Sequence, residues 1–358
     1  MIRVRTKKGE AMKSRRLFSA AALCAALLAA LPAAAQYAGQ SCTAPAAATV
    51  RQAPAQFGFR MNGTFRVMQL TDLHMTADFR SDHLFPMLGQ LIQYEQPDLI
   101  VITGDLIYAP CDEVLWRRLG DFLASQHVPY AITLGNHDAE RIPRSRVYEI
   151  VRTLPLCVNA AFNPEEERQG DFVIPIGAFD DPKRIEALLY VMDTNDYNAD
   201  DRSYAGFEPA QIAWYEATSA RIEREAGRKP NALMFFHVPL HEFTEAVEAG
   251  CPLTGFRLEN ECPARDNAGM FDAVLRRGDV CGIFAGHDHA NNYVTEYRGV
   301  VLGFGRYSGT FGEYQELLSG ARMFELKAGE RGFTTWERLA NNSVARRRTF
   351  PTPKPADE

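Results

Sequence analysis

Five short, largely apolar runs in this chain each end directly in a polar motif, and this repeated arrangement constrains the fold more than any other feature. Such runs, bounded by turn residues, are typical of buried β-strands. Because the carboxyl ends of neighbouring strands in an open α/β sheet meet at one crevice, we expect the five motifs to converge. The predicted strands are Phe65–Leu70, Leu99–Ile102, Tyr130–Leu134, Ala232–Phe236 and Val280–Ala285.

The motifs that follow these strands are rich in histidine, aspartate and asparagine, and they contain five of the eight histidines of the chain. Imidazole nitrogens, carboxylates and an amide oxygen suit Mn, Fe or Zn ions, whereas a thiolate site would contain clustered cysteines. In chain order the motifs are Asp72-Leu73-His74, Gly104-Asp105, Gly135-Asn136-His137-Asp138, His237 and Gly286-His287-Asp288-His289.

Each motif alone carries little weight, since Gly-Asp is common in loops and a single histidine such as His237 is more often packed than a ligand. All five in order, each after a predicted strand, indicate a two-metal site. Two ions about 3.5–4 Å apart can hold a bridging hydroxide and stabilise both the attacking and the leaving oxygen of an in-line displacement at phosphorus. The predicted reaction is therefore phosphoester hydrolysis.

The motifs resemble those of the calcineurin-like metallophosphoesterases, and within that superfamily the small branch similar to purple acid phosphatases. The resemblance covers about Phe57–Leu339. It implies an α/β fold, a four-layer αββα sandwich of two mixed sheets flanked by helices, and it implies that Asp105 is a bridging carboxylate. The implied ligands are Asp72, His74, Asp105 and His289 for the first metal, and Asp105, Asn136, His237 and His287 for the second.

The same resemblance gives His137 a role without a metal, in which it binds the phosphoryl oxygen or protonates the leaving group while Asp138 orients its ring. One departure concerns Tyr108, which matches the iron-binding tyrosine of purple acid phosphatases, whereas those enzymes have glycine in place of His74. Two bulky ligands do not share one coordination position, so either His74 or Tyr108 binds the first metal. We favour His74, because a tyrosine shortly after a strand more often packs.

Four further polar residues are candidates for the substrate pocket. His241 and Glu242 follow a predicted ligand closely, although Glu242 equally suits the first turn of a helix over Glu242–Glu248. Asn292 lies just after the last motif. Arg306 makes either a bidentate contact with phosphate or an ordinary salt bridge.

The amino-terminal segment 1–35 is predicted to be a cleavable signal peptide, with Met12 as an alternative start. Its basic beginning, Ala/Leu core and small residues before Gln36 favour export to the periplasm or secretion, and not a membrane anchor. The pair Arg15-Arg16 also resembles a twin-arginine export motif, so Sec and twin-arginine export both stay open.

Removal of this segment changes the charge of the chain. The segment carries a net charge of +6, so the formal net charge of −6 for the whole chain becomes −12. Such an acidic body disfavours nucleic acid or an anionic membrane as the main partner. The expected partner is a small phosphorylated substrate, attracted locally by the metal ions. The oligomeric state is not indicated.

Export also permits disulfides. Cys251 and Cys262 bracket a Pro/Gly-bearing loop and are the best pair, whereas Cys281 lies inside an apolar strand and is predicted to be a free, buried thiol. Cys42, Cys111 and Cys157 cannot be paired from the sequence.

The chain is predicted to contain an Ala/Pro-rich lead-in over 36–55, one domain over 56–340 and a loose tail over 341–358. Phe57–Leu70 reads as a hairpin that turns at Asn62-Gly63. Helical patterns over Asp82–Glu95, Asp112–Ser125 and Pro209–Glu225 alternate with the first strands. The later strand-like runs, expected to form the second sheet, are Leu188–Met192, Tyr293–Tyr297, Val300–Phe304, Arg322–Leu326 and Phe333–Arg338.

The leading hypothesis is an exported dinuclear phosphomonoesterase in which a metal-bridging hydroxide attacks phosphorus directly. One alternative is a phosphodiesterase acting on nucleotides or glycerophosphodiesters, which would use the same ligands. Another is a non-catalytic metal- or phosphate-binding scaffold that keeps the fold. The choice of substrate is expected to depend on the loops Asn159–Arg184 and Gly250–Asn267.

Overall fold

The computed structural model describes residues 53–54, 56–77, 81–108, 112–163, 170–310 and 317–351. The predicted signal peptide 1–35, the lead-in as far as residue 52, and residues 352–358 lie outside the described residues, as do Cys42 and Cys111. The signal peptide therefore stays a prediction.

One of the two sheets has six strands in the order β13-β12-β11-β2-β3-β4. The strands β2, β3 and β4 run parallel to one another, and β11, β12 and β13 continue the sheet in antiparallel pairs. The bounds are β2 Thr64–Leu70, β3 Leu99–Thr103, β4 Tyr130–Thr133, β11 Gly320–Lys327, β12 Phe333–Leu339 and β13 Val344–Phe350.

The other sheet has seven strands in the order β1-β5-β6-β7-β8-β10-β9, and β6, β7, β8 and β10 are parallel. The bounds are β1 Phe57–Gly58, β5 Phe172–Gly177, β6 Ile185–Val191, β7 Asn231–Phe235, β8 Val280–Ala285, β9 Val294–Tyr297 and β10 Val300–Phe304.

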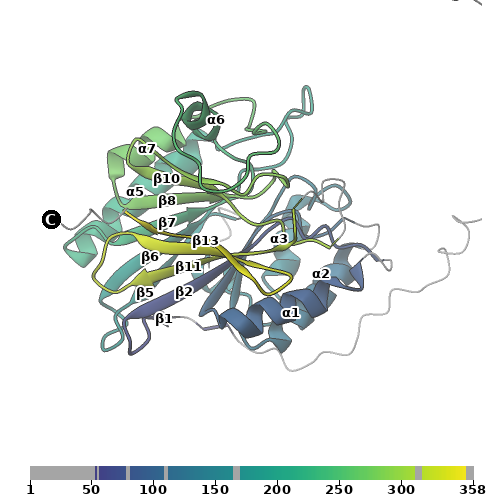
Figure 1. Cartoon of the computed structure of the whole chain (residues 1–358), viewed down its shortest axis with the longest axis horizontal. Helices are drawn as coiled ribbons and strands as arrows, with labels where there is room; N and C mark the ends of the chain where they lie inside the picture. Colours follow the sequence, from purple (N-terminus) through teal and green to yellow (C-terminus); the bar gives the residue numbers. More distant parts are fainter. Residues whose placement is uncertain are drawn as a thin grey trace, which may run out of the picture. The chain divides into compact units, whose positions relative to one another are not determined.

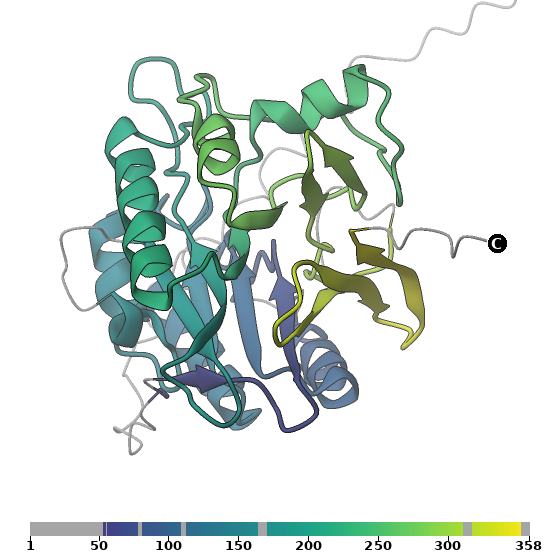
Figure 2. The same cartoon turned by 90° about the vertical axis from the view of Figure 1, so that its left-hand side faces the viewer.

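Helices lie on the outer faces of both sheets, with α1, α2 and α3 on one side and α5, α6 and α7 on the other (Figures 1 and 2). The bounds are α1 Leu84–Glu95, α2 Asp112–Ser125, α3 Arg144–Val151, α4 Asn159–Phe162, α5 Pro209–Ala226, α6 His241–Glu248 and α7 Met270–Arg277.

Three apolar cores hold the layers together, and alternation along each strand explains them. On β3, Ile100 and Ile102 pack under the helices α1 and α2, whereas Leu99 and Val101 face the seven-stranded sheet. The side chains of a strand point alternately to its two faces, so a strand buried on both faces reads as a continuous apolar run. On β6, Tyr190 packs with α5 to α7 and the flanking residue Leu189 faces the other sheet. The fold is therefore a four-layer αββα sandwich, as predicted.

The five strands predicted to carry the polar motifs are all present, with ends within one residue of the expected positions. The three predicted helices are also present as α1, α2 and α5. The later strands do not form a separate sheet as expected. Instead β6, β9 and β10 extend the seven-stranded sheet, while β11 and β12 join β2 in the other. Sequence order alone does not specify which exposed strand edge a later strand will pair with.

The predicted hairpin over Phe57–Leu70 is wrong. The Asn62-Gly63 turn does form, with φ of 74° at Gly63 and its N–H donating to the Arg60 carbonyl at 2.8 Å. However, β1 pairs with β5 in one sheet while β2 belongs to the other. The phenylalanines around β1 are buried between the sheets, and that burial decides the pairing.

The predicted loose tail is wrong for its first half, because β13 pairs with β12. Its three consecutive arginines each have a partner in the structure. Arg346 donates to Glu337 at 2.6 Å, the guanidinium of Arg347 lies 4.0 Å from the centre of the Trp336 ring, and Arg348 donates to Thr254 at 3.1 Å. A basic run that looks unstructured in the sequence is thus ordered by two partners on the neighbouring strand β12 and by Thr254, which is distant in sequence.

Another strand, β5, lies inside the predicted substrate loop Asn159–Arg184. Within the described part of the chain, no helix combines the length and the apolar character needed to cross a bilayer.

Candidate metal centre

The polar motifs converge where the parallel strands of both sheets end. Asp72 and His74 follow β2, Asp105 follows β3, and Asn136 follows β4 in the six-stranded sheet. The other sheet supplies His237 after β7 and both His287 and His289 after β8. The centre therefore lies across the carboxyl edges of two sheets, as the sequence predicted from the position of each motif.

Four of these residues adopt a left-handed backbone conformation, which is rare outside glycine. The φ angles are 54° at Asp72, 45° at His74, 52° at Asp105 and 75° at His287. Each such residue costs about 1–3 kcal/mol and persists only where the surrounding structure imposes it. This concentration of strain at one edge is typical of a functional site.

Two glycines in the motifs allow the ligand segments to approach one another. A Cβ atom at Gly135 would collide with the carboxylate of Asp105, and one at Gly286 would collide with the hydroxyl of Thr71. Both positions therefore require glycine for steric reasons. This explains why Gly precedes Asn136 and His287 in the motifs.

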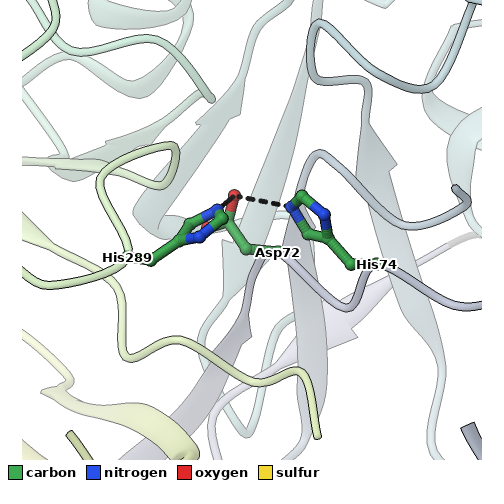
Figure 3. Close-up of side chains that lie close together, drawn as sticks. All are labelled: Asp72, His74 and His289. Carbon is green, nitrogen blue, oxygen red and sulfur yellow. Dashed lines mark ion pairs between the residues drawn. The ribbon is translucent and has the colours of Figure 1, made fainter. Parts of the chain in front are cut away.

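The first cluster contains Asp72, His74 and His289, whose ligand atoms lie within 4.8 Å of one another. Figure 3 shows the two imidazoles on either side of the Asp72 carboxylate. His289 Nε2 is 3.4 Å from Asp72 Oδ1, and His74 Nε2 is 4.0 Å from the same oxygen. These atoms surround one point with two nitrogens and a carboxylate oxygen, a donor set that suits Fe, Mn or Zn.

The second cluster contains Asp105, His237 and His287, again with ligand atoms within 4.8 Å of one another. Asn136 joins it, since its Oδ1 lies 3.1 Å from His237 Nε2. The Nδ1 of His237 lies 2.7 Å from the Thr103 carbonyl, which can only accept a hydrogen bond. Nδ1 must therefore carry the proton, and Nε2 is the nitrogen left for a metal.

Asp105 lies between the clusters. Its Oδ2 is 3.2 Å from His237 Nε2 and 3.6 Å from His74 Nε2, while its Oδ1 accepts a hydrogen bond from the His137 backbone N–H at 2.9 Å. One oxygen thus faces both clusters and the other is held by the backbone. This is the arrangement that a bridging carboxylate requires.

A buried polar atom provides a direct test of whether the residues fit metal ions. His74 Nε2 is buried and forms no hydrogen bond with any described residue, although two carboxylates lie within 4 Å of it. A buried acceptor nitrogen left without a partner is costly. A cation between His74, Asp72 and Asp105 would satisfy it, so the residues present fit a metal.

The protonation of the cluster residues supports the same conclusion. Burial lowers the pKa of His74 to about 4 and that of His287 to about 3, so both imidazoles are neutral and able to bind a metal. Although burial opposes it, His237 lowers the pKa of Asp105 well below its usual range, and Asp105 raises the pKa of His237 to about 9. A cation bound there would replace the proton on His237 as the positive charge that faces Asp105.

The structure corrects the predicted partner of His137. Asp138 does not orient the ring, because its two carboxylate oxygens accept hydrogen bonds from the backbone N–H groups of Asp105, Leu106, Ile107 and Gly135. The His137 Nδ1 instead lies 2.8 Å from Glu140 Oε1. Burial and then the nearby Asp105 raise the pKa of Asp138 to about 6. Asp138 therefore fixes the loop that carries Asp105.

Tyr108 is 50% exposed, and its ring packs edge-on against His137 with the ring centres 5.3 Å apart. Its ring centre lies 6.0 Å from that of His74, which occupies the first cluster. This placement favours His74 over Tyr108 as the ligand.

The remaining predicted site residues form hydrogen bonds with groups outside the two clusters. His241 begins α6 and its Nε2 lies 2.6 Å from the Ala264 carbonyl. Asn292 is fully buried and donates to Glu337 at 3.2 Å. Arg306 is 2% exposed, donates to the Leu318 carbonyl and faces Glu337. Arg306 thus belongs to a buried polar network around Glu337, which favours the salt bridge over the contact with phosphate.

Two residues of the site were missed by the sequence analysis, namely Glu140 and Tyr197. Glu140 follows His137 by three residues, and a turn after the motif brings residues at that spacing into contact. This spacing was the available signal in the sequence. The Tyr197 hydroxyl accepts a hydrogen bond from Asn136 Nδ2 at 2.8 Å across 61 residues of sequence. No pattern in the sequence pointed to that contact.

The predicted Cys251–Cys262 disulfide is wrong, because both thiols are free. Cys251 packs against the core under α5 to α7, whereas Cys262 is exposed and donates weakly to the Asn260 carbonyl. Cys281 is a free, buried thiol as predicted, and burial raises its pKa to about 12.

Comparison with known proteins agrees with this geometry. The family model for calcineurin-like phosphoesterases matches residues 65–291, from β2 through the last motif. The chain belongs to this family. The match covers the whole set of candidate ligands.

Members of the family with and without an assigned activity resemble the chain. "Probable inactive purple acid phosphatase 29" of Arabidopsis thaliana is 29% identical over 299 residues, which cover 74% of this chain and 76% of that protein. "Phosphatase DCR2" of Saccharomyces cerevisiae is 25% identical over 321 residues, covering 77% of this chain and 54% of that protein. A dimetal phosphatase from Danio rerio shares the fold, with a TM-score of 0.56 at 12% identity, covering 80% of this chain and 98% of that chain.

Proposed function

We propose that this protein is a dinuclear metal-dependent phosphomonoesterase that is exported to the periplasm or secreted. The observation that carries the proposal is the position of Asp105 Oδ2, which faces a histidine of each cluster at 3.2 and 3.6 Å. Two neighbouring cation sites that share a carboxylate are suited to displacement at phosphorus. The expected ions are Fe, Mn or Zn, from the mixture of imidazole, carboxylate and amide donors.

The residues of the chain would hold the ions in the order that the sequence predicts. Asp72, His74 and His289 would bind one ion, and Asn136, His237 and His287 the other, with Asp105 shared. When bound, the metals supply a nucleophilic water and neutralise charge on the phosphoryl oxygens. The Asp105 backbone N–H donates to the Asp138 carboxylate and the Asp105 carboxylate accepts from the His137 backbone N–H, and these hydrogen bonds keep the shared ligand in place.

His137 would donate a proton to the leaving oxygen. Its Nδ1 is paired with Glu140, so the Nε2 is left for the substrate. The carboxylate of Glu140 would fix the tautomer and the orientation of the ring, and the edge of Tyr108 would limit its rotation. Donation from a positioned histidine contributes about 100- to 10,000-fold to such a reaction.

A second candidate is a non-catalytic binding protein, and it is favoured by one observation, the word "inactive" in the name of a relative. The chain keeps every ligand type implied by the family resemblance, together with His137. This retention supports turnover.

The test combines metal analysis with initial rates on p-nitrophenyl phosphate and bis-p-nitrophenyl phosphate. About two metal ions per chain and faster monoester turnover are expected. Faster diester turnover would favour the assignment as a phosphodiesterase over that as a phosphomonoesterase. Two bound ions without turnover of either compound would favour the binding protein. A visible charge-transfer band would show that Tyr108 is a ligand of the metal.

A further inference from the structure

A pocket of about 340 Å³ lies directly beside the second cluster. It shares Asn136 with that cluster and continues from there along the Glu140 turn and a loop on the opposite side. Almost all of its wall is polar. The lining residues are Asn136, Ala139, Glu140, Arg141, Asp196, Tyr197 and Arg202.

Tyr197 connects this pocket to the candidate metal ligands. Its hydroxyl accepts a hydrogen bond from Asn136 Nδ2 at 2.8 Å, which turns the Asn136 Oδ1 toward His237. The guanidinium of Arg202 lies over the same tyrosine ring, 4.6 Å from its centre. A cation on an aromatic face is held by electrostatic attraction. Arg202 is therefore positioned above a residue that itself contacts the centre.

The loop that carries Tyr197 and Arg202 is fixed to the rest of the domain. Tyr197 pairs with Tyr204 through a β-bridge, and their rings stack with centres 5.7 Å apart. The Tyr204 ring packs edge-on against the ring of His287 in the second cluster, with the ring centres 4.3 Å apart. Arg265 donates its backbone N–H to the Tyr204 carbonyl at 2.9 Å. These contacts attach the loop to the second cluster.

Among the described residues, the acidic groups around the pocket leave its two arginines without an ion-pair partner. Asp200 and Asp201, the acids nearest in sequence to Arg202, are both paired with Arg265, at 2.9 and 3.1 Å. Glu140 is paired with His137. In the described part of the chain, neither Arg141 nor Arg202 forms an ion pair or a side-chain hydrogen bond, and both are exposed.

One carboxylate of the wall opposes this positive charge. The Asp196 Oδ1 accepts a hydrogen bond from the Tyr197 backbone N–H at 2.6 Å. Asp196 also interacts with the guanidinium of Arg144, which is paired with Asp193. Asp196 therefore accepts a hydrogen bond within the loop and faces another cation, Arg144. In the described part of the chain it forms no ion pair with Arg141 or Arg202, so both guanidinium groups can bind an anion.

We propose that Arg141 and Arg202 form a second anion-binding subsite next to the metal centre, which selects phosphate esters whose leaving group carries another anionic group. The proposal rests on the proposed function for the bond that is hydrolysed. Guanidinium groups bind carboxylate and phosphate oxygens in a bidentate manner, so either group fits this chemistry. The substrate class is then small phosphorylated acids or bisphosphates.

The first experiment compares three substrates that differ only in one ring substituent: phenyl phosphate, 4-carboxyphenyl phosphate and 1,4-phenylene bisphosphate. The readout is the KM of phenyl phosphate divided by that of each anionic substrate, for Mn²⁺-loaded protein. We expect this ratio to be well above one, and to fall about three- to tenfold in the double variant Arg141→Gln/Arg202→Gln.

The matched control is Arg298→Gln, since Arg298 is an exposed arginine that pairs with Asp272 and does not line the pocket. This control should leave the ratio unchanged. A fall for only one of the two anionic substrates would identify carboxylate or phosphate as the group that is bound. A ratio of one in the wild type, or equal changes in the double variant and the control, would overturn the subsite.

A binding measurement separates this proposal from the proposed function. Calorimetry would compare benzylphosphonate with 4-carboxybenzylphosphonate, neither of which can be hydrolysed as an ester. If the wild type turns over none of the esters but prefers the carboxylated phosphonate, and the double variant loses this preference, the hydrolase is wrong and the subsite stands. Equal binding of both phosphonates by the wild type would exclude the subsite whatever the rates are.

Discussion

The two ligand clusters contain similar residues but differ in how tightly the protein surrounds them. The side chain of His237 in the second cluster is 0% exposed and is held by the Thr103 carbonyl, and Asn136 beside it is held by Tyr197. The side chains of His74 and His289 in the first cluster are each 14% exposed. His74 Nε2, moreover, has no hydrogen-bond partner among the described residues.

This difference teaches how one centre can combine a fixed ion with an accessible one. Ligands that are oriented by outer hydrogen bonds lose less freedom when they bind a metal, so they bind more tightly. We therefore infer that the second site retains its ion longer, and that the first site exchanges its ion more readily. A change at the shared carboxylate should abolish this asymmetry, and changes at single clusters should reveal it.

Asp105→Asn should have the largest effect, because the shared carboxylate serves both clusters. We expect loss of both tightly bound ions and a fall in the hydrolysis rate of about 1,000-fold or more. Metal analysis after dialysis and initial rates measure this, with circular dichroism as the control for folding. Retention of two ions per chain would contradict the bridging role.

His137→Ala should lower the hydrolysis rate about 100- to 10,000-fold while both ions stay bound, since His137 belongs to neither cluster. The comparison with Asp105→Asn then separates proton donation from metal binding. Rates on p-nitrophenyl phosphate and metal content are measured on the same samples. An unchanged rate with full metal content would show that His137 donates no proton.

Glu140→Gln should lower the rate about fivefold, because the neutral amide keeps a hydrogen bond to His137 but loses its charge. Asp138→Asn should act differently, since its amide nitrogen would replace an oxygen that accepts backbone hydrogen bonds. We expect Asp138→Asn to lower the free energy of unfolding by about 1–3 kcal/mol. Urea unfolding and rate profiles distinguish the two. The reverse pattern would restore Asp138 as the partner of His137.

His237→Ala and His74→Ala compare the clusters directly. In metal-free protein we expect His237→Ala to lower the free energy of unfolding by about 1–3 kcal/mol, because it removes a fully buried hydrogen bond to the Thr103 carbonyl, which then keeps Thr71 Oγ1 as a side-chain donor. His74→Ala removes a nitrogen that has no hydrogen-bond partner among described residues, so the cost should be smaller. Thermal and urea unfolding in EDTA test this. Equal losses in both variants would remove the asymmetry.

The sequence predicted the structure correctly where local chemistry decides the outcome. The strands β2, β3, β4, β7 and β8 were predicted because buried strands between two layers are continuously apolar. The ligand types, their order and their place at strand ends followed from the same motifs. It failed at β13, where Arg346 and Arg347 read as a loose basic run until Glu337 and Trp336 provide partners.

The residues of the chain by themselves determined which donors are available and that they stand at the carboxyl ends of strands, because periodicity and metal chemistry are local properties. Only the tertiary structure decided that Glu140, and not Asp138, contacts His137, and that Tyr197 meets Asn136. It also left Arg141 and Arg202 beside the centre without ionic partners among the described residues. The physical reason is that partners distant in sequence compete for each polar group, and packing decides between them only once the sheets have formed.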